Sequence, residues 1–212
     1  MNSEQKYYQH VVQSILLYEE ESAEMPEVKL QRDEVLTLLE ELGAELAERG
    51  IDSPVQIIVF GGVYMLMQIG NRLSTHDVDI VPLASSTDPQ QETRRQKIFK
   101  QASNAVASRH NLPRNWINDD GALFVEEIIQ KGELVRWKTF QMLEIWLPEL
   151  ACMLALKLTA FRPLQDMDDT LHLCQALNVT SAEEAQAILD RYVPTAWQEE
   201  NLVDETLMDL FG

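Results

Sequence analysis

The stretch covering residues 57–81, IIVFGGVYMLMQIGNRLSTHDVDIV, constrains what this 212-residue chain can fold into more than any other part of it. Two apolar runs flank a Gly61-Gly62 pair and a short helical pattern, and the second run carries Asp77 and Asp79. Residues two apart in an extended strand point to the same face, about 7 Å apart. Two carboxylates so placed suit a hard cation such as Mg²⁺, which prefers oxygen ligands. The stretch therefore predicts a strand, a glycine turn, a helix and an acidic strand around a candidate site.

Hydrophobic periodicity and turn residues place the remaining elements. We expect helices near 5–24, 33–49, 63–69, 88–109, 149–161, 163–177, 181–192 and from 195 or 196 onward, and strands at 55–60, 77–81 and, as one or two strands, 133–147. Pro82 is expected to close the second strand, and residues 116–119 to form a loop with a short helical turn.

The strands cluster between residues 55 and 147, whereas the last third of the chain is helical, so the class is α+β or α/β. We take it as α+β, with a small mixed β-sheet core flanked by helices and a helical C-terminal part. The expected organisation is an N-terminal helical extension over 1–30, the core over 31–148, and a helical region over 149–212 packed on that core.

Charge and composition exclude some classes of function. The formal net charge of −18 opposes non-specific attachment to nucleic acid, although it permits a local basic pocket or a basic protein partner. No basic start precedes an apolar run, and no window approaches the roughly 18 apolar residues of a membrane span. Cys152 and Cys174 lie in apolar helical contexts without metal-ligand spacing, so we expect reduced core cysteines in a cytoplasmic protein.

The glycine pair and the aspartate pair together predict a binding site more strongly than either pair alone. Gly61 and Gly62 would let backbone N–H groups approach an anion closely at the start of a helix. If the two strands pair, a phosphate near Gly62 would lie beside a cation on Asp77 and Asp79, which suits phosphoryl or nucleotidyl transfer. Either motif alone is more simply a turn or a pair of strand-end acids; the two together favour a site.

The same stretch resembles the signature of the nucleotidyltransferase superfamily (DNA polymerase β-like), in which a GG or GS turn precedes an hDhDh strand. The interval of 14 residues between Gly62 and Asp77 is towards the long end. The run Arg72-x-x-Thr75-x-Asp77-x-Asp79 is similar to that of minimal bacterial members related to toxin-type nucleotidyltransferases.

Two further stretches extend the resemblance. LPRNWIND at 112–119 and KLTAFRPLQDMDD at 157–169 are similar to the LPxxWLND and KLxAxRPxDxxD elements of the DUF6036-type branch. The likeness covers roughly residues 33–177, and the helices at both ends of the chain lie outside it.

The resemblance implies that Gly61 and Gly62 contact nucleotide phosphates and that Asp77 and Asp79 bind Mg²⁺ or Mn²⁺. Many active members use a third carboxylate on a later strand to activate the attacking hydroxyl. Glu144 is the candidate, because it is an acid inside an otherwise apolar strand-like run; Glu133 is the alternative, and some members of the branch lack this acid.

The resemblance also assigns Arg72, Thr75 and Lys157 to nucleotide binding. Arg72 would bind phosphate, or pair with one of the two aspartates when no nucleotide is bound. Lys157 either extends its amine from an apolar helix face to water or reaches a triphosphate, and the resemblance favours the triphosphate. Three charged residues after it are expected to form an ion-pair network that fixes two helices: Arg162, Asp166 and Asp169.

Two functional hypotheses follow. The first is a metal-dependent nucleotidyltransferase that moves NMP from an NTP such as ATP to a hydroxyl on RNA, protein or a small molecule. The toxin-type likeness would place it in a toxin–antitoxin or defence system, with a cognate toxin or antitoxin as partner. The second is a catalytically inactive protein of the same fold that binds nucleotide or a protein partner in a regulatory, antitoxin-like role. A nucleic-acid-binding module is a third class, which the charge and the lack of a basic stripe oppose.

Overall fold

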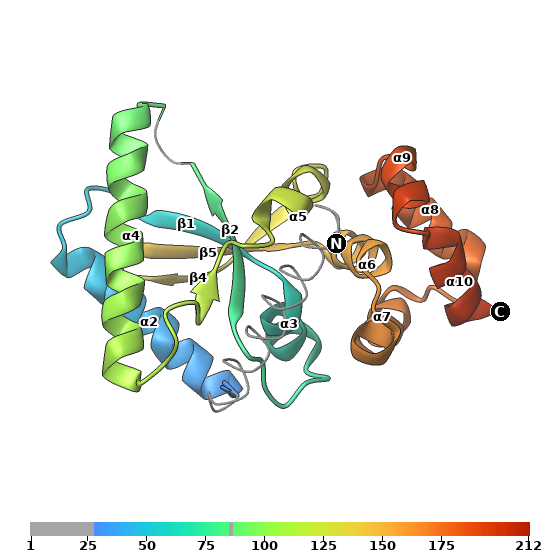
Figure 1. Cartoon of the computed structure of the whole chain (residues 1–212), viewed down its shortest axis with the longest axis horizontal. Helices are drawn as coiled ribbons and strands as arrows, with labels where there is room; N and C mark the ends of the chain where they lie inside the picture. Colours follow the sequence, from blue (N-terminus) through green and yellow to red (C-terminus); the bar gives the residue numbers. More distant parts are fainter. Residues whose placement is uncertain (1–27, 85–86) are drawn as a thin grey trace, which may run out of the picture.

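The computed structural model describes residues 28–84 and 87–212, which form an α+β fold with a five-stranded mixed sheet flanked by helices (Figure 1). This confirms the predicted fold class. The helix predicted over residues 5–24 lies outside the described residues.

The sheet has the strand order β3-β2-β1-β5-β4. Its strands are β1 (Val55–Val59), β2 (Val78–Leu83), β3 (Ile117–Asn118), β4 (Leu134–Phe140) and β5 (Leu143–Pro148). β1 runs antiparallel to β2 and parallel to β5, whereas β3 runs parallel to β2. The region predicted as one or two strands is the β4–β5 hairpin, which turns at Gln141 with a φ of 47°.

The prediction that Pro82 closes the second strand is wrong, because β2 continues to Leu83. The N–H of Phe60 donates to the carbonyl of Asp79 at 3.2 Å, so Pro82 falls three residues on, at a position that makes no bond to β1. β3 pairs only with Val78 and Asp79, which leaves the nitrogen of Pro82 facing the unpaired edge.

A short helix connects β1 to the loop before β2. It begins as α3 (Gly61–Tyr64) and continues as a π-helical turn, η1 (Met65–Ile69), which ends at Gly70 with a left-handed φ of 76°. The sequence predicted this helix over 63–69; the structure starts it at the glycine pair itself. Bulges of the π type occur often at functional sites.

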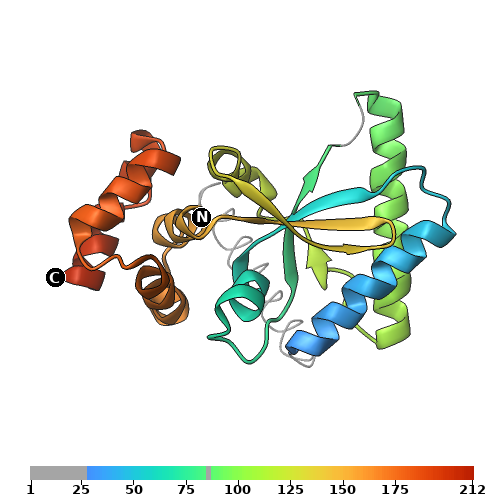
Figure 2. The same cartoon turned by 180° about the vertical axis from the view of Figure 1, so that it is seen from behind.

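Two long helices lie at the end of the sheet that is away from the C-terminal helices (Figures 1 and 2). They are α2 (Arg32–Glu48) and α4 (Pro89–His110), which pack against each other. A capping box of Gln31 and Glu34 starts α2, and the carboxylate of Asp88 accepts the N–H of Gln90 at the start of α4. Their leucine, alanine and valine faces join the central core.

The C-terminal part is helical, as predicted. Its helices are α6 (Leu150–Thr159), α7 (Pro163–Leu177), α8 (Ala182–Tyr192), α9 (Thr195–Glu200) and α10 (Val203–Phe211). A further helix, α5 (Ala122–Ile129), lies earlier in the chain, between β3 and β4. The sequence did not predict α5, and the last predicted helix is two helices, because Leu202 adopts a left-handed φ of 52°.

Helix α6 connects the sheet to the C-terminal helices. It packs on α5, α7 and α8, and its residues from Cys152 to Leu158 are all buried. Figures 1 and 2 show α6 and α7 between the sheet and α8–α10. Cys152 and Cys174 are free and buried, as predicted. In the described part of the chain, no helix is both long and apolar enough to cross a membrane.

Candidate functional site

A cavity of about 840 Å³ opens where β1 ends and β2 begins, and α6 and α7 close its other side. Every predicted site residue except Glu144 lines this cavity, which we call the Asp79 cavity. Its lining comprises Gly61, Gly62, Arg72, Leu73, Ser74, Thr75, His76, Asp77, Asp79, Lys157, Arg162, Gln165, Asp168 and Asp169.

The glycine pair lies directly against the acidic strand. Gly61 has a φ of +65°, and a Cβ there would approach Oδ2 of Asp79 to 2.3 Å. A Cβ on Gly62 would lie 2.8 Å from the hydroxyl of Thr75 and 3.0 Å from Nη1 of Arg72. The left-handed φ and the aspartate oxygen favour glycine at position 61, whereas a Cβ at position 62 would require the side chains of Thr75 and Arg72 to shift; the backbone of this turn forms part of the cavity wall.

Thr75 holds the loop before β2 in place. Two backbone hydrogen bonds of 2.7 and 2.9 Å pair it with Leu30, just before α2. Its hydroxyl donates to the carbonyl of Asp77 at 3.1 Å, and its side chain is buried. These contacts make Thr75 a positioning residue for Asp77 and the glycine turn. Its predicted contact with nucleotide stays a prediction.

The half-buried carboxyl of Asp79 carries the main electrostatic signal of the cavity. Burial and the nearby negative charge of Asp77 raise the pKa of Asp79 to about 6, with a smaller contribution from Asp120; Lys157 and Arg162 oppose this rise. A divalent cation between these carboxylates would reverse the shift, because it would favour the ionised form. The pair therefore fits a cation electrostatically.

β3 adds two residues that sequence reasoning did not assign to the site. Asn118 pairs with Asp79 in the sheet, and its amide donates to Oδ2 of Asp77 at 3.3 Å. The N–H of Asp120 donates to Oδ1 of Asn118 at 3.2 Å. Residues 116–119 were expected to form a loop, but the structure forms this short strand. The likeness of LPRNWIND to a family element was the only signal for it in the sequence.

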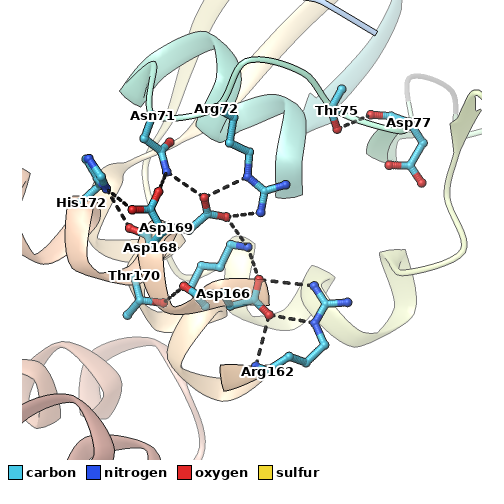
Figure 3. A network of polar contacts seen from close by, with 11 residues as sticks. Asn71, Arg72, Thr75, Asp77, Arg162, Asp166, Asp168, Asp169, Thr170 and His172 are labelled. Atoms are coloured by element: carbon cyan, nitrogen blue, oxygen red, sulfur yellow. Dashed lines mark hydrogen bonds and ion pairs between the residues drawn. The ribbon is translucent and has the colours of Figure 1, made fainter. Parts of the chain in front are cut away.

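Three cations and two buried aspartates form a connected cluster on the α6–α7 side of the cavity (Figure 3). Lys157 contacts Asp166 at 2.5 Å and Asp169 at 2.8 Å. Arg72 donates to both oxygens of Asp169, at 2.9 and 2.5 Å, and Arg162 donates to Asp166 at 2.8 Å. The side chains of both aspartates are only 2% exposed, so the cluster fixes the loop before β2 to α6 and α7.

These contacts decide several predictions. The ion-pair network expected of Arg162, Asp166 and Asp169 is confirmed, and Lys157 belongs to it rather than extending to water. Arg72 pairs with Asp169. The pairing with Asp77 or Asp79 that was expected when no nucleotide is bound is not formed. Burial alone would raise the pKa of the cluster's aspartates, but the bonds they accept from these cations hold both pKa values below the ordinary range.

The prediction that Glu144 completes the carboxylate set is wrong in this structure. Glu144 lies opposite Gln56 on β1, accepts its amide at 2.8 Å, and approaches Arg136 at 3.8 Å. Asp79 lies opposite Phe60, four residues further along β1, which corresponds to about 13 Å. Because β1 and β5 are parallel, a residue near the start of β5 lies at the wrong end of the sheet.

Comparisons with protein-family models, with curated proteins and with solved structures find no match to this chain. Among residues 28–84 and 87–212, no three His, Cys, Asp or Glu side chains are arranged to hold a metal ion. Mg²⁺ is often held by one or two carboxylates while substrate phosphates and water complete its shell.

Proposed function

We propose that this protein binds a nucleoside triphosphate together with Mg²⁺ or Mn²⁺ and transfers its nucleoside monophosphate to a hydroxyl acceptor. The observation that supports this most strongly is the contact between the glycine turn and the acidic strand. Gly61 leaves room for one oxygen of Asp79, so a half-buried glycine turn and two carboxylates meet at one wall of a cavity.

The charges of the cavity favour a ligand that brings its own cation. Arg72 and Lys157 already pair with buried carboxylates, while Asp77 and Asp79 add two negative charges. A triphosphate alone would meet repulsion at these aspartates. A bound divalent ion neutralises the phosphates and stabilises the attacking and leaving oxygens in transfers of this type.

This chain's own residues would then hold the ligand in place. Asp77 and Asp79 would hold the cation, and Asn118 and Thr75 orient Asp77 through its side chain and its backbone. The cavity is wide enough to admit a nucleotide. Arg162, whose side chain is 66% exposed, is the cation of the cluster most accessible to a phosphate from solvent.

A second candidate function is nucleotide binding without transfer. The displacement of Glu144 to the far end of β1 favours it, because no third carboxylate on β5 reaches the pair to deprotonate an acceptor. A protein of this kind would act through a partner, such as a cognate toxin or antitoxin.

Incubation with α-labelled NTPs and Mg²⁺ tests the first function and separates it from the second. Label transfer by the wild type should fall at least tenfold in Asp77→Asn and Asp79→Asn, since each removes a charged ligand of the cation. Glu144→Gln serves as the matched control. Transfer that neither aspartate substitution changes would contradict the mechanism, whereas metal-dependent binding without transfer would support the second function.

A further inference from the structure

A second cavity, of about 420 Å³, lies under α4 on the opposite face of β2; we call it the α4 cavity. Ile80 lines it, whereas the preceding residue, Asp79, lines the first cavity, as alternation along a strand requires. The charged lining residues of the α4 cavity are three cations and three acids: Arg95, Lys100, Arg114, Glu92, Asp119 and Asp120.

The floor of the α4 cavity is apolar. Ile57 and Ile80 lie beneath this floor at 0% and 1% exposed and offer almost no surface to a ligand, so half-buried Leu83 and Phe99 form its accessible apolar walls. Its volume is that of a pocket for a small molecule, in which apolar contacts supply most of the affinity and a few polar groups fix orientation. The aromatic ring of Phe99 offers a surface for an aromatic or branched aliphatic group.

Two exposed cations, Lys100 and Arg114, line this cavity. Lys100 is on α4, and Arg114 is in the loop that leads to β3. The indole N–H of Trp116 donates to the carbonyl of Ser103 at 3.1 Å, and the hydroxyl of Ser103 donates to the carbonyl of Lys100 at 3.0 Å. These bonds hold the Arg114 loop against the same turn of α4 that carries Lys100.

Lys100 and Arg114 differ from Arg95, the third cation in the lining, in exposure and in the contacts of their side chains. Arg95 is 5% exposed, and both terminal nitrogens of its guanidinium donate to Asp52, Ser53 and Pro54. Lys100 and Arg114 are exposed, and neither side chain makes an ion pair or hydrogen bond within residues 28–84 and 87–212. Three carboxylates, Glu92, Asp119 and Asp120, are in the lining as well, so an anionic group on a ligand would be held at Lys100 and Arg114 and not elsewhere in the cavity.

We propose that the α4 cavity is a binding site for a small carboxylate with an aromatic or branched aliphatic body. The body would lie against Phe99 and Leu83, and the carboxylate would meet Lys100 and Arg114. The proposal does not rest on nucleotidyl transfer, since it needs neither nucleotide nor metal. It does connect the two cavities, because Asn118 lines this one and also bonds Asp77.

The test is an NMR titration of the ¹⁵N-labelled full chain with 3-phenylpropionate and with its neutral amide, without nucleotide or metal. Amide signals around Phe99, Ile80 and Asn118 should shift in a saturable way. The neutral amide should bind about tenfold more weakly, because it lacks the charge-assisted bonds.

Matched substitutions separate the site from a general charge effect. Lys100→Ala with Arg114→Ala should weaken 3-phenylpropionate about tenfold or more, and both positions are exposed, so the fold is retained. Arg94→Ala with Lys97→Ala removes two exposed cations from the same helix outside the cavity and should leave binding unchanged. The absence of clustered shifts in the millimolar range, or equal binding by both double variants, would overturn the proposal.

Discussion

Replacing Asp79 with Asn should stabilise the fold at neutral pH, although it removes a proposed ligand of the metal. Burial and the charge of Asp77 raise the pKa of Asp79 from 3.8 to about 6. The folded state therefore binds more protons than the unfolded state between these two values. Stability due to this group falls as the pH rises from about 4 to about 6 and stays low above that range. Asn is neutral at every pH, so the variant does not lose the stability that ionisation of the Asp79 carboxyl removes.

The size of the effect follows from the shift. A difference of about two pKa units corresponds to about 3 kcal/mol. The carboxyl is only half-buried, so screening by solvent reduces the expected gain to about 1–2 kcal/mol at neutral pH. For a chain of this size, that gain raises the melting temperature by about 3–6 °C. At about pH 4, where the carboxyl is protonated in the folded state, the difference should nearly vanish.

Urea and thermal unfolding across this pH range measure the effect in the absence of divalent ions. Asp209→Asn is the control, because it makes the same chemical change at an exposed position of α10 and so reports the general benefit of reducing a net charge of −18. The reasoning is refuted if Asp79→Asn gains no more than the control at neutral pH, or gains as much at about pH 4. Added Mg²⁺ should stabilise the wild type and not the Asp79→Asn variant.

Three further predictions concern the walls of the site. Gly61→Ala should cost about 2–4 kcal/mol in urea unfolding, because the new Cβ meets an aspartate oxygen, whereas Gly70→Ala, with the same left-handed φ and open space, should cost only about 1 kcal/mol. Asp169→Ala should destabilise the fold by about 3 kcal/mol, because Arg72 loses its carboxylate partner and Lys157 keeps only Asp166; a loss no larger than that caused by replacing an exposed aspartate would contradict this. Glu144→Gln should leave metal-dependent nucleotide binding within about twofold of the wild type in calorimetry, and a tenfold loss would return it to the site.

The local part of the site could be predicted from the sequence because it depends on neighbours in the chain. A glycine pair between a strand and a helix, and two acids at alternate strand positions, specify their own geometry. The pairing of β1 with β2 then follows from two apolar runs that are close in sequence. The sequence thus placed Gly61, Gly62, Asp77 and Asp79 together, and the structure confirms their common cavity.

The parts that sequence reasoning missed depend on distant pairing. Arg72 meets Asp169 across 97 residues, and no local pattern indicates which of several acids will reach it. Glu144 was chosen because it is an acid in an apolar run, but the register of β5 against β1 decides which end of the sheet it occupies. The two-residue strand β3 is too short to leave a periodic signal, so hydrophobic periodicity could not indicate the roles of Asn118 and Asp120.

The most direct test of the central claim is calorimetry of the full chain with ATP, with Mg²⁺ present and then removed by chelation. If Asp77 and Asp79 hold a metal–nucleotide complex against the glycine turn, the wild type binds ATP only with the cation. Asp79→Asn then weakens that binding by at least tenfold, and Glu144→Gln binds like the wild type. Binding that is independent of the cation, or equal in the wild type and Asp79→Asn, would contradict the account.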